Sequence, residues 1–229
     1  MPSEPEFYVG YLPMPSGVRR TIAGVVIALG ILAVTAAAIL IAGQHPFAPS
    51  TFEFQQYREF RGTLLAGPYP ALAIPGQGSP WLLVGPGKHG AGDLRQLNGR
   101  DVRLKGERVF RGQDHMIELL PGTLSPGGRS DRIATAVDLG EVQLTGEIVD
   151  SKCYFGVMNP GNGKVHRDCA VRCISGGIPP AFLVRDVAGR TETLPLDNWK
   201  PALLDHIAEP ITIRGRLAHS SGRLTLFAE

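Results

Sequence analysis

Three cysteines and one histidine are gathered in a short stretch of the 229-residue chain. Cys153, His166, Cys169 and Cys173 have the spacing C-x12-H-x2-C-x3-C, and no cysteine lies elsewhere. Thiolate sulfur and imidazole nitrogen are ligands for zinc and Cu(I), and thiolates also hold iron–sulfur clusters. One interpretation is therefore a Cys3His metal site. The spacing is not that of a standard zinc finger, and the C-x-x-C-H pattern of covalent haem attachment is missing.

The same residues also fit a disulfide. Cys153 paired with Cys169 or with Cys173 would close a loop that contributes about 3 kcal/mol in the chain-entropy picture. Such bridges form and persist outside the cytoplasm. This interpretation leaves one thiol without a partner, which a metal site does not.

Reactive thiol chemistry is the third interpretation. A basic neighbour such as Lys152, Arg167 or Arg172 could lower the pKa of a thiol and activate it. The sequence shows no Ser/His/Asp set, phosphate-binding loop or paired-carboxylate site in a recognisable context. We therefore assign no catalytic residue and favour a protein that is not an enzyme.

An apolar segment near the N-terminus indicates where the cysteine cluster resides. Thr21 to Ala42 is a run of 22 residues without a charge, which as a helix spans a hydrocarbon core of about 30 Å. It is longer than the apolar part of a cleaved signal peptide. Arg19 and Arg20 precede it, and basic residues favour the cytoplasmic side.

We therefore predict a single-pass protein of the bacterial inner membrane, in contact with the lipid bilayer. Residues 1–20 form a cytoplasmic tail, 21–43 the transmembrane helix, and the remainder a periplasmic body. Four apolar residues stand out in the tail: Phe7, Tyr8, Tyr11 and Leu12. They form either an aromatic belt at the membrane interface or a partner-binding surface for a neighbouring integral-membrane subunit.

Composition limits the remaining possibilities. A formal net charge of +2, from 23 basic and 21 acidic residues, argues against nucleic acid as a partner, since that needs a concentrated basic face. The 29 glycines and 19 prolines favour short strands and turns over a helical bundle. The body is therefore predicted to be mainly β.

A repeat runs through this body. Alternating segments at 60–65, 80–84, 101–109 and 115–119 recur in order at 144–149, 180–184, 210–217 and 223–227. The matched positions are Gly62 with Gly146, Gly106 with Gly215, and Pro80 with Pro180. Glycine within a strand marks a bulge or the sharp bend of a small barrel, and the pattern resembles the OB-fold. We predict two tandem OB-like barrels, 51–124 and 140–229, joined by a linker at 125–139.

The cysteine stretch is predicted to be an insertion in the second copy. Gly146 and Pro180 are 34 positions apart, against 18 for Gly62 and Pro80, an excess of 16 residues. Lys164 to Ile174 has helical character and ends at a glycine pair. The second barrel is therefore expected to carry an inserted helix that bears the cysteines and the histidine.

The stretch also resembles a known type of domain. Its pattern, G-E-I-V-D-x-x-C-Y…H-x-x-C-A-x-x-C-x-x-G-G-I-P, is similar to that of bacterial membrane-anchored extracytoplasmic domains, some of which accompany membrane oxidoreductases. The similarity covers residues 146–184. It implies a non-catalytic accessory or assembly subunit of a membrane-bound respiratory redox complex. The alternative function is a metal-binding or thiol-redox protein of the periplasm.

Overall fold

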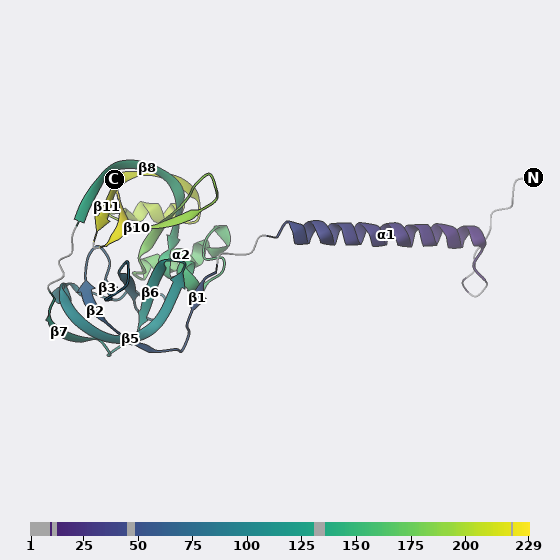
Figure 1. Cartoon of the computed structure of the whole chain (residues 1–229). Coiled ribbons are helices and arrows are strands. Elements are labelled where there is room, and N and C mark those ends of the chain that lie inside the picture. Colours follow the sequence, from purple (N-terminus) through teal and green to yellow (C-terminus); the bar gives the residue numbers. More distant parts are fainter. Residues whose placement is uncertain (1–9, 11–12, 45–48, 131–135, 221) are drawn as a thin grey trace, which may run out of the picture. The chain divides into compact units, whose positions relative to one another are not determined.

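The structure is a computed structural model that describes residues 10, 13–44, 49–130, 136–220 and 222–229. Internal contacts divide the chain into two units, Met1–Pro46 and Phe47–Glu229. Figure 1 labels α1 of the first unit and many of the strands of the second. We call Phe47–Glu229 the β unit.

The first unit contains one long helix, α1 (Ser16–Ala42). Its 27 residues are apolar enough and numerous enough to cross a membrane, which confirms the prediction of a helix with these properties. The helix begins before the predicted start at residue 21 and includes Arg19 and Arg20. The tail residues proposed to bind a partner, Phe7, Tyr8, Tyr11 and Leu12, lie outside the described residues.

The N-terminal half of the β unit forms a seven-stranded sheet. Its strands are β1 (Thr51–Phe52), β2 (Arg58–Leu65), β3 (Ala71–Ala73), β4 (Trp81–Val84), β5 (Arg100–Arg111), β6 (Asp114–Leu119) and β7 (Ser125–Arg129). A short 3-10 turn, η1 (Arg95–Leu97), precedes β5. In β5 the buried Val102 and Leu104 alternate with exposed Arg103 and Lys105, as expected where one face covers a core.

The C-terminal half forms a closed barrel in the order β10-β12-β11-β8-β9. Its strands are β8 (Ala136–Asp150), β9 (Pro180–Arg185), β10 (Thr191–Asp197), β11 (Pro210–Ser220) and β12 (Arg223–Ala228). Apolar side chains such as Phe182, Leu196 and Leu226 fill its interior. A 3-10 helix, η4 (Pro201–His206), connects β10 to β11.

The two halves repeat one order of strand partners. In the sheet, β2 pairs with β3, β3 with β4, β4 with β6, β6 with β5 and β5 with β2, and β4–β6 is the parallel pair. The barrel has the same order of pairing: β8 pairs with β9, β9 with β10, β10 with β12, β12 with β11 and β11 with β8. Its parallel pair is β10–β12.

The matched glycines agree with this correspondence. A Cβ on Gly62 would collide with the Ala73 carbonyl in β3, and one on Gly146 with the Leu183 carbonyl in β9. Both positions therefore need glycine, because the next strand approaches closely.

The predicted match between Pro80 and Pro180 is wrong. Residues 180–185 form β9, the counterpart of β3, whereas 81–84 form β4, the counterpart of β10. The sequence comparison failed because β3 has three residues, all buried, and therefore no alternating pattern. The connection after the first strand thus grows from five residues (66–70) to 29 (151–179). The excess is 29 − 5 = 24 residues, against the predicted 16.

This long connection contains three helical pieces. They are the π-helical η2 (Cys153–Val157), the 3-10 turn η3 (Lys164–His166) and α2 (Arg167–Ser175). The region predicted as a linker, 125–139, includes β7, which pairs with β5, and the start of β8.

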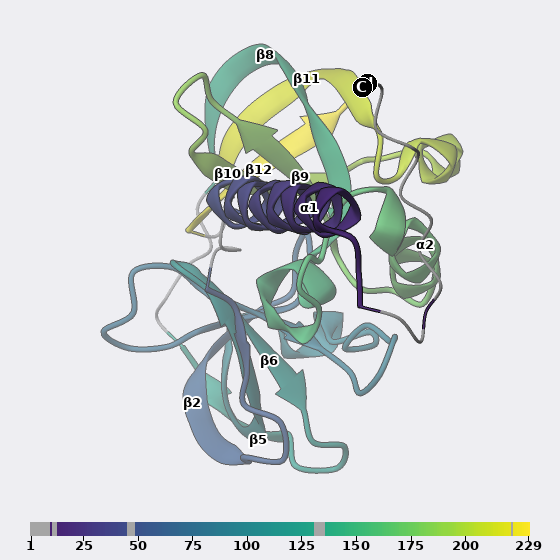
Figure 2. The ribbon, with the colours of Figure 1, turned by 90° about the vertical axis from the view of Figure 1, so that its right-hand side faces the viewer.

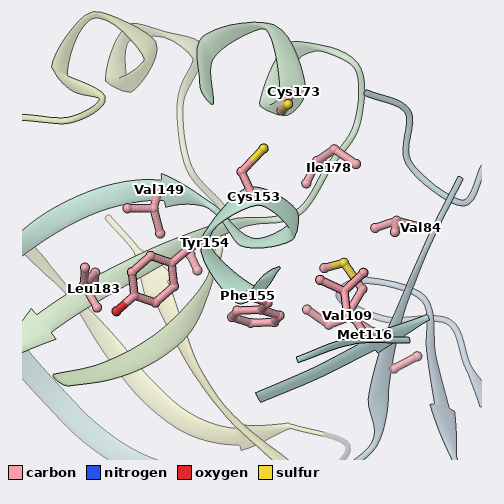
Figure 3. Close-up of a cluster of buried hydrophobic side chains, with 13 residues drawn as sticks. Val84, Val109, Met116, Val149, Cys153, Tyr154, Phe155, Cys173, Ile178 and Leu183 are labelled. Atoms are coloured by element: carbon pink, nitrogen blue, oxygen red, sulfur yellow. The ribbon is translucent and has the colours of Figure 1, made fainter. Parts of the chain in front are cut away.

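The connection packs between the sheet and the barrel. Figure 2 shows its helical turns lying between the barrel strands and β2, β5 and β6. Phe155 of η2 is buried in one core cluster together with Val109 and Met116 of the sheet and Leu183 of the barrel, as Figure 3 shows. Burying a phenylalanine stabilises by about 1.5–3 kcal/mol. The connection between β8 and β9 therefore helps to join the sheet to the barrel.

Candidate metal centre

A buried carboxylate at the end of β8 positions two of the predicted ligands. Oδ1 of Asp150 accepts the backbone N–H of Cys153 at 2.7 Å, as a capping residue does at a helix start. Oδ2 of the same carboxylate lies 2.8 Å from Nε2 of His166. Both side chains are almost fully buried, so this contact supplies a polar partner that solvent does not.

The structure brings all four predicted ligands together around Cys153. Ligand atoms of Cys153, His166 and Cys169 lie within 4.8 Å of one another, and so do those of Asp150, Cys153 and Cys173. In a tetrahedral site, Zn–S bonds of about 2.3 Å and Zn–N bonds of about 2.0 Å put the ligand atoms about 3.5–3.8 Å apart. The two sets share Cys153, which is therefore the residue common to both groups of ligand atoms.

His166 and Cys173 lie on two consecutive helical pieces. In a regular helix, Cα atoms seven residues apart, such as those of His166 and Cys173, are separated by about 10 Å. Here His166 ends a 3-10 turn and α2 begins at the next residue. The ligand atoms of His166 and Cys173 each lie near that of Cys153 but do not share one group. Cys153 opens a π-helical turn, a local form that occurs often at functional sites. Figure 3 shows its side chain pointing toward the helix that carries Cys173.

A lysine that the sequence did not single out contacts two of the sulfurs. Nζ of Lys88 lies 2.8 Å from Sγ of Cys169 and 3.6 Å from Sγ of Cys173. Lys88 belongs to the loop between β4 and β5, which packs on the end of α2. There the N–H of Gly90 donates to the carbonyl of Gly176 at 3.0 Å.

Gly176 permits this packing, because a Cβ there would collide with the Lys88 carbonyl. The sequence predicts the glycine pair only as the end of a helix. Its first glycine also leaves room for the loop between β4 and β5 that carries Lys88. The one signal for Lys88 in the sequence is its place in the glycine-rich segment GPGKHGAG (85–92).

Lys152 is one of the three basic residues considered as a thiol activator, and its ammonium contacts other groups. Its buried Nζ forms an ion pair with Oε2 of Glu118 at 2.6 Å. It also donates to the carbonyls of Gly85 and Gly87, at 3.0 and 2.6 Å. Lys152 thus holds the loop that carries Lys88 through two hydrogen bonds, and its charge is paired with Glu118.

The thiols of Cys153 and Cys173 share a hydrogen bond in which Cys153 donates and Cys173 accepts. The hydrogen bond from Cys153 lowers the pKa of Cys173 to about 6, and the charge of Lys88 acts in the same direction. That hydrogen bond, together with burial, raises the pKa of Cys153. The hydrogen bond to Cys169 raises the pKa of Lys88, so the ammonium is charged at neutral pH. The lowered pKa of Cys173 favours the thiolate, the form that binds metals.

All three cysteines are free in this structure. A disulfide between Cys153 and either Cys169 or Cys173 stays a prediction for the oxidised protein. Comparisons of the chain with models of protein families, with curated proteins and with solved structures find no match. The function of the protein is therefore inferred from the geometry of this cluster.

Proposed function

We propose that the β unit binds a single thiophilic metal ion, zinc or Cu(I), through Cys153, His166, Cys169 and Cys173. The observation that carries this proposal is the 2.8 Å contact between Asp150 and His166 beside three free cysteines. A metal-binding imidazole commonly gives its second nitrogen to a carboxylate, which fixes the ring and strengthens the ligand. A disulfide has no use for such a pair.

The proposed ion would be held by Nδ1 of His166, since Nε2 faces Asp150. Three thiolates and a divalent ion leave a net charge of −1, which the ammonium of Lys88 offsets. The closeness of the ligand atoms favours one ion over an iron–sulfur cluster, whose several iron and sulfide atoms need more room between the thiolates.

The wider context is also proposed. The apolar α1 supports a single-pass anchor in a bacterial inner membrane, with the N-terminus cytoplasmic and the β unit periplasmic. The shared partner order supports two OB-like barrels, the second with the cysteine-bearing insertion. The sequence resemblance supports an accessory or assembly subunit of a membrane redox complex, with Phe7, Tyr8, Tyr11 and Leu12 facing the membrane partner.

Metal analysis of purified variants tests the ligand set. We expect about one ion per chain in the wild type, and loss of that ion in Cys153→Ser and in His166→Ala. His206→Ala is the matched control, because His206 is 55% exposed and lies outside the cluster. Retention of the full metal content by His166→Ala would remove the histidine from the site and with it the proposal.

A further inference from the structure

The four proposed ligands differ in their access to solvent. Cys153, His166 and Cys173 are buried, with 4%, 3% and 2% of their surface exposed. Cys169 is only partly buried. An ion held by these residues is therefore reachable from solvent on the Cys169 side.

A fixed positive charge stands on that same side. The ammonium of Lys88 is 2.8 Å from the Cys169 sulfur, closer than to Cys173. The loop that bears it is fastened at two places, by Lys152 to the carbonyls of Gly85 and Gly87 and by the Gly90–Gly176 hydrogen bond. Lys88 thus stays beside Cys169 through its backbone as well as through its side chain.

We propose that the site exchanges its metal and that Cys169 is the ligand which leaves; this rests on the metal-binding function proposed above. In the first step an incoming thiolate from a cysteine-bearing acceptor forms a new bond to the ion while the bond from the ion to Cys169 breaks. Transfer is complete when further donor atoms of the acceptor have replaced Cys153, Cys173 and His166 in the same way. The bonding electron pair stays on the Cys169 sulfur, so no electron is transferred and no oxidant is needed. The reverse sequence loads the site.

Lys88 assists this exchange. Coordination withdraws negative charge from a thiolate, so an ammonium stabilises the released Cys169 thiolate more than the coordinated one. The ammonium of Lys88 already lies against the Cys169 sulfur, so it is in place when the bond to the ion breaks. The protein would therefore transfer its ion to a thiol-bearing acceptor and would not retain it as a permanent structural ion.

The rate of metal transfer tests this directly. Zinc-loaded full-length protein in detergent is mixed with a chromophoric chelator, and the appearance of the zinc–chelator complex is followed over time. Lys88→Met keeps the length of the side chain but removes its charge. We expect transfer to slow by about tenfold, equivalent to about 1.4 kcal/mol. Lys164→Met, at an exposed lysine of the same insertion, should transfer at the wild-type rate.

Mapping of alkylated cysteines gives an independent measurement. When zinc-loaded protein meets a small excess of a maleimide, Cys169 should be modified before Cys153 and Cys173. Unchanged or faster transfer in Lys88→Met, or first modification at Cys153 or Cys173, would overturn the exchange proposal. The zinc content of the starting protein separates the two proposals. If no zinc is bound, the metal site itself fails; if zinc is bound but Cys169 is not labile, only the exchange fails.

Discussion

Asp150 and His166 lie 2.8 Å apart in the interior of the protein, one at the end of a barrel strand and the other at the end of a 3-10 turn 16 residues later. The same carboxylate also accepts the backbone N–H of Cys153. One side chain thus holds two of the proposed ligands in place, and the contact explains why the long connection between β8 and β9 contains a buried histidine.

We predict that Asp150→Asn weakens metal binding without unfolding the protein. The amide keeps an oxygen for the Cys153 N–H but loses the charge that makes His166 a stronger ligand. Replacing a residue that hydrogen-bonds to a metal ligand commonly lowers the affinity for the metal about 10–100-fold. Competition against a chelator of known affinity measures the loss. Asp168→Asn, at an exposed acidic residue of α2, is the control and should bind as the wild type does.

Phe155→Ala is predicted to destabilise the β unit by about 3–5 kcal/mol, the usual range for removing a buried aromatic ring. Because Phe155 packs against both the sheet and the barrel, the unit should unfold in a single transition. Urea denaturation followed by fluorescence measures this. Val165→Ala, at a residue 86% exposed, should change little. Separate transitions for the two halves would contradict a shared core.

The Lys152–Glu118 ion pair is predicted to stabilise the loop that carries Lys88. Lys152→Met should cost about 3–5 kcal/mol, because it leaves Glu118 without its partner in a largely buried position. The double variant with Glu118→Gln should recover part of that loss, which a double-mutant cycle in urea measures. Additive effects of the two substitutions would show that the pair is not coupled.

The anchor makes a prediction about the mature protein. If α1 spans the membrane uncleaved, a reporter fused after Glu229 should be active only outside the cytoplasm, and N-terminal sequencing should find Met1 or Pro2. Deleting residues 4–15 should leave the β unit folded but release a membrane partner in co-purification. A mature N-terminus near Gln44 would contradict the anchor.

Most of the strand framework could be predicted from the sequence, because alternating segments and matched glycines mark β2, β5, β8 and β11. The short strand β3 could not, since three consecutive buried residues have no period. The cluster of Cys153, His166, Cys169 and Cys173 could be predicted as a group from ligand type and spacing. Its surroundings could not: Lys88 reaches Cys169 across 81 positions of sequence, a contact that only the packing of the β4–β5 loop on α2 creates.

The role of the insertion also needed the structure. The sequence predicts only that the stretch adds residues to one copy of a repeat, and it does not show what those residues pack against. In the structure Phe155 and Cys153 of η2 complete a core cluster that contains residues of both halves. Loss of an ion bound there should therefore loosen the contact between sheet and barrel as well as the site.

The central claim is tested most directly by measuring metal and thiols together on the purified protein. Elemental analysis gives the metal content, and titration with a thiol reagent after chelation and denaturation gives the free cysteines. The metal-site account predicts about one zinc or copper ion per chain and three free thiols after the ion is removed. A protein without metal, with one free thiol and with its remaining two cysteines oxidised to a disulfide, would contradict it.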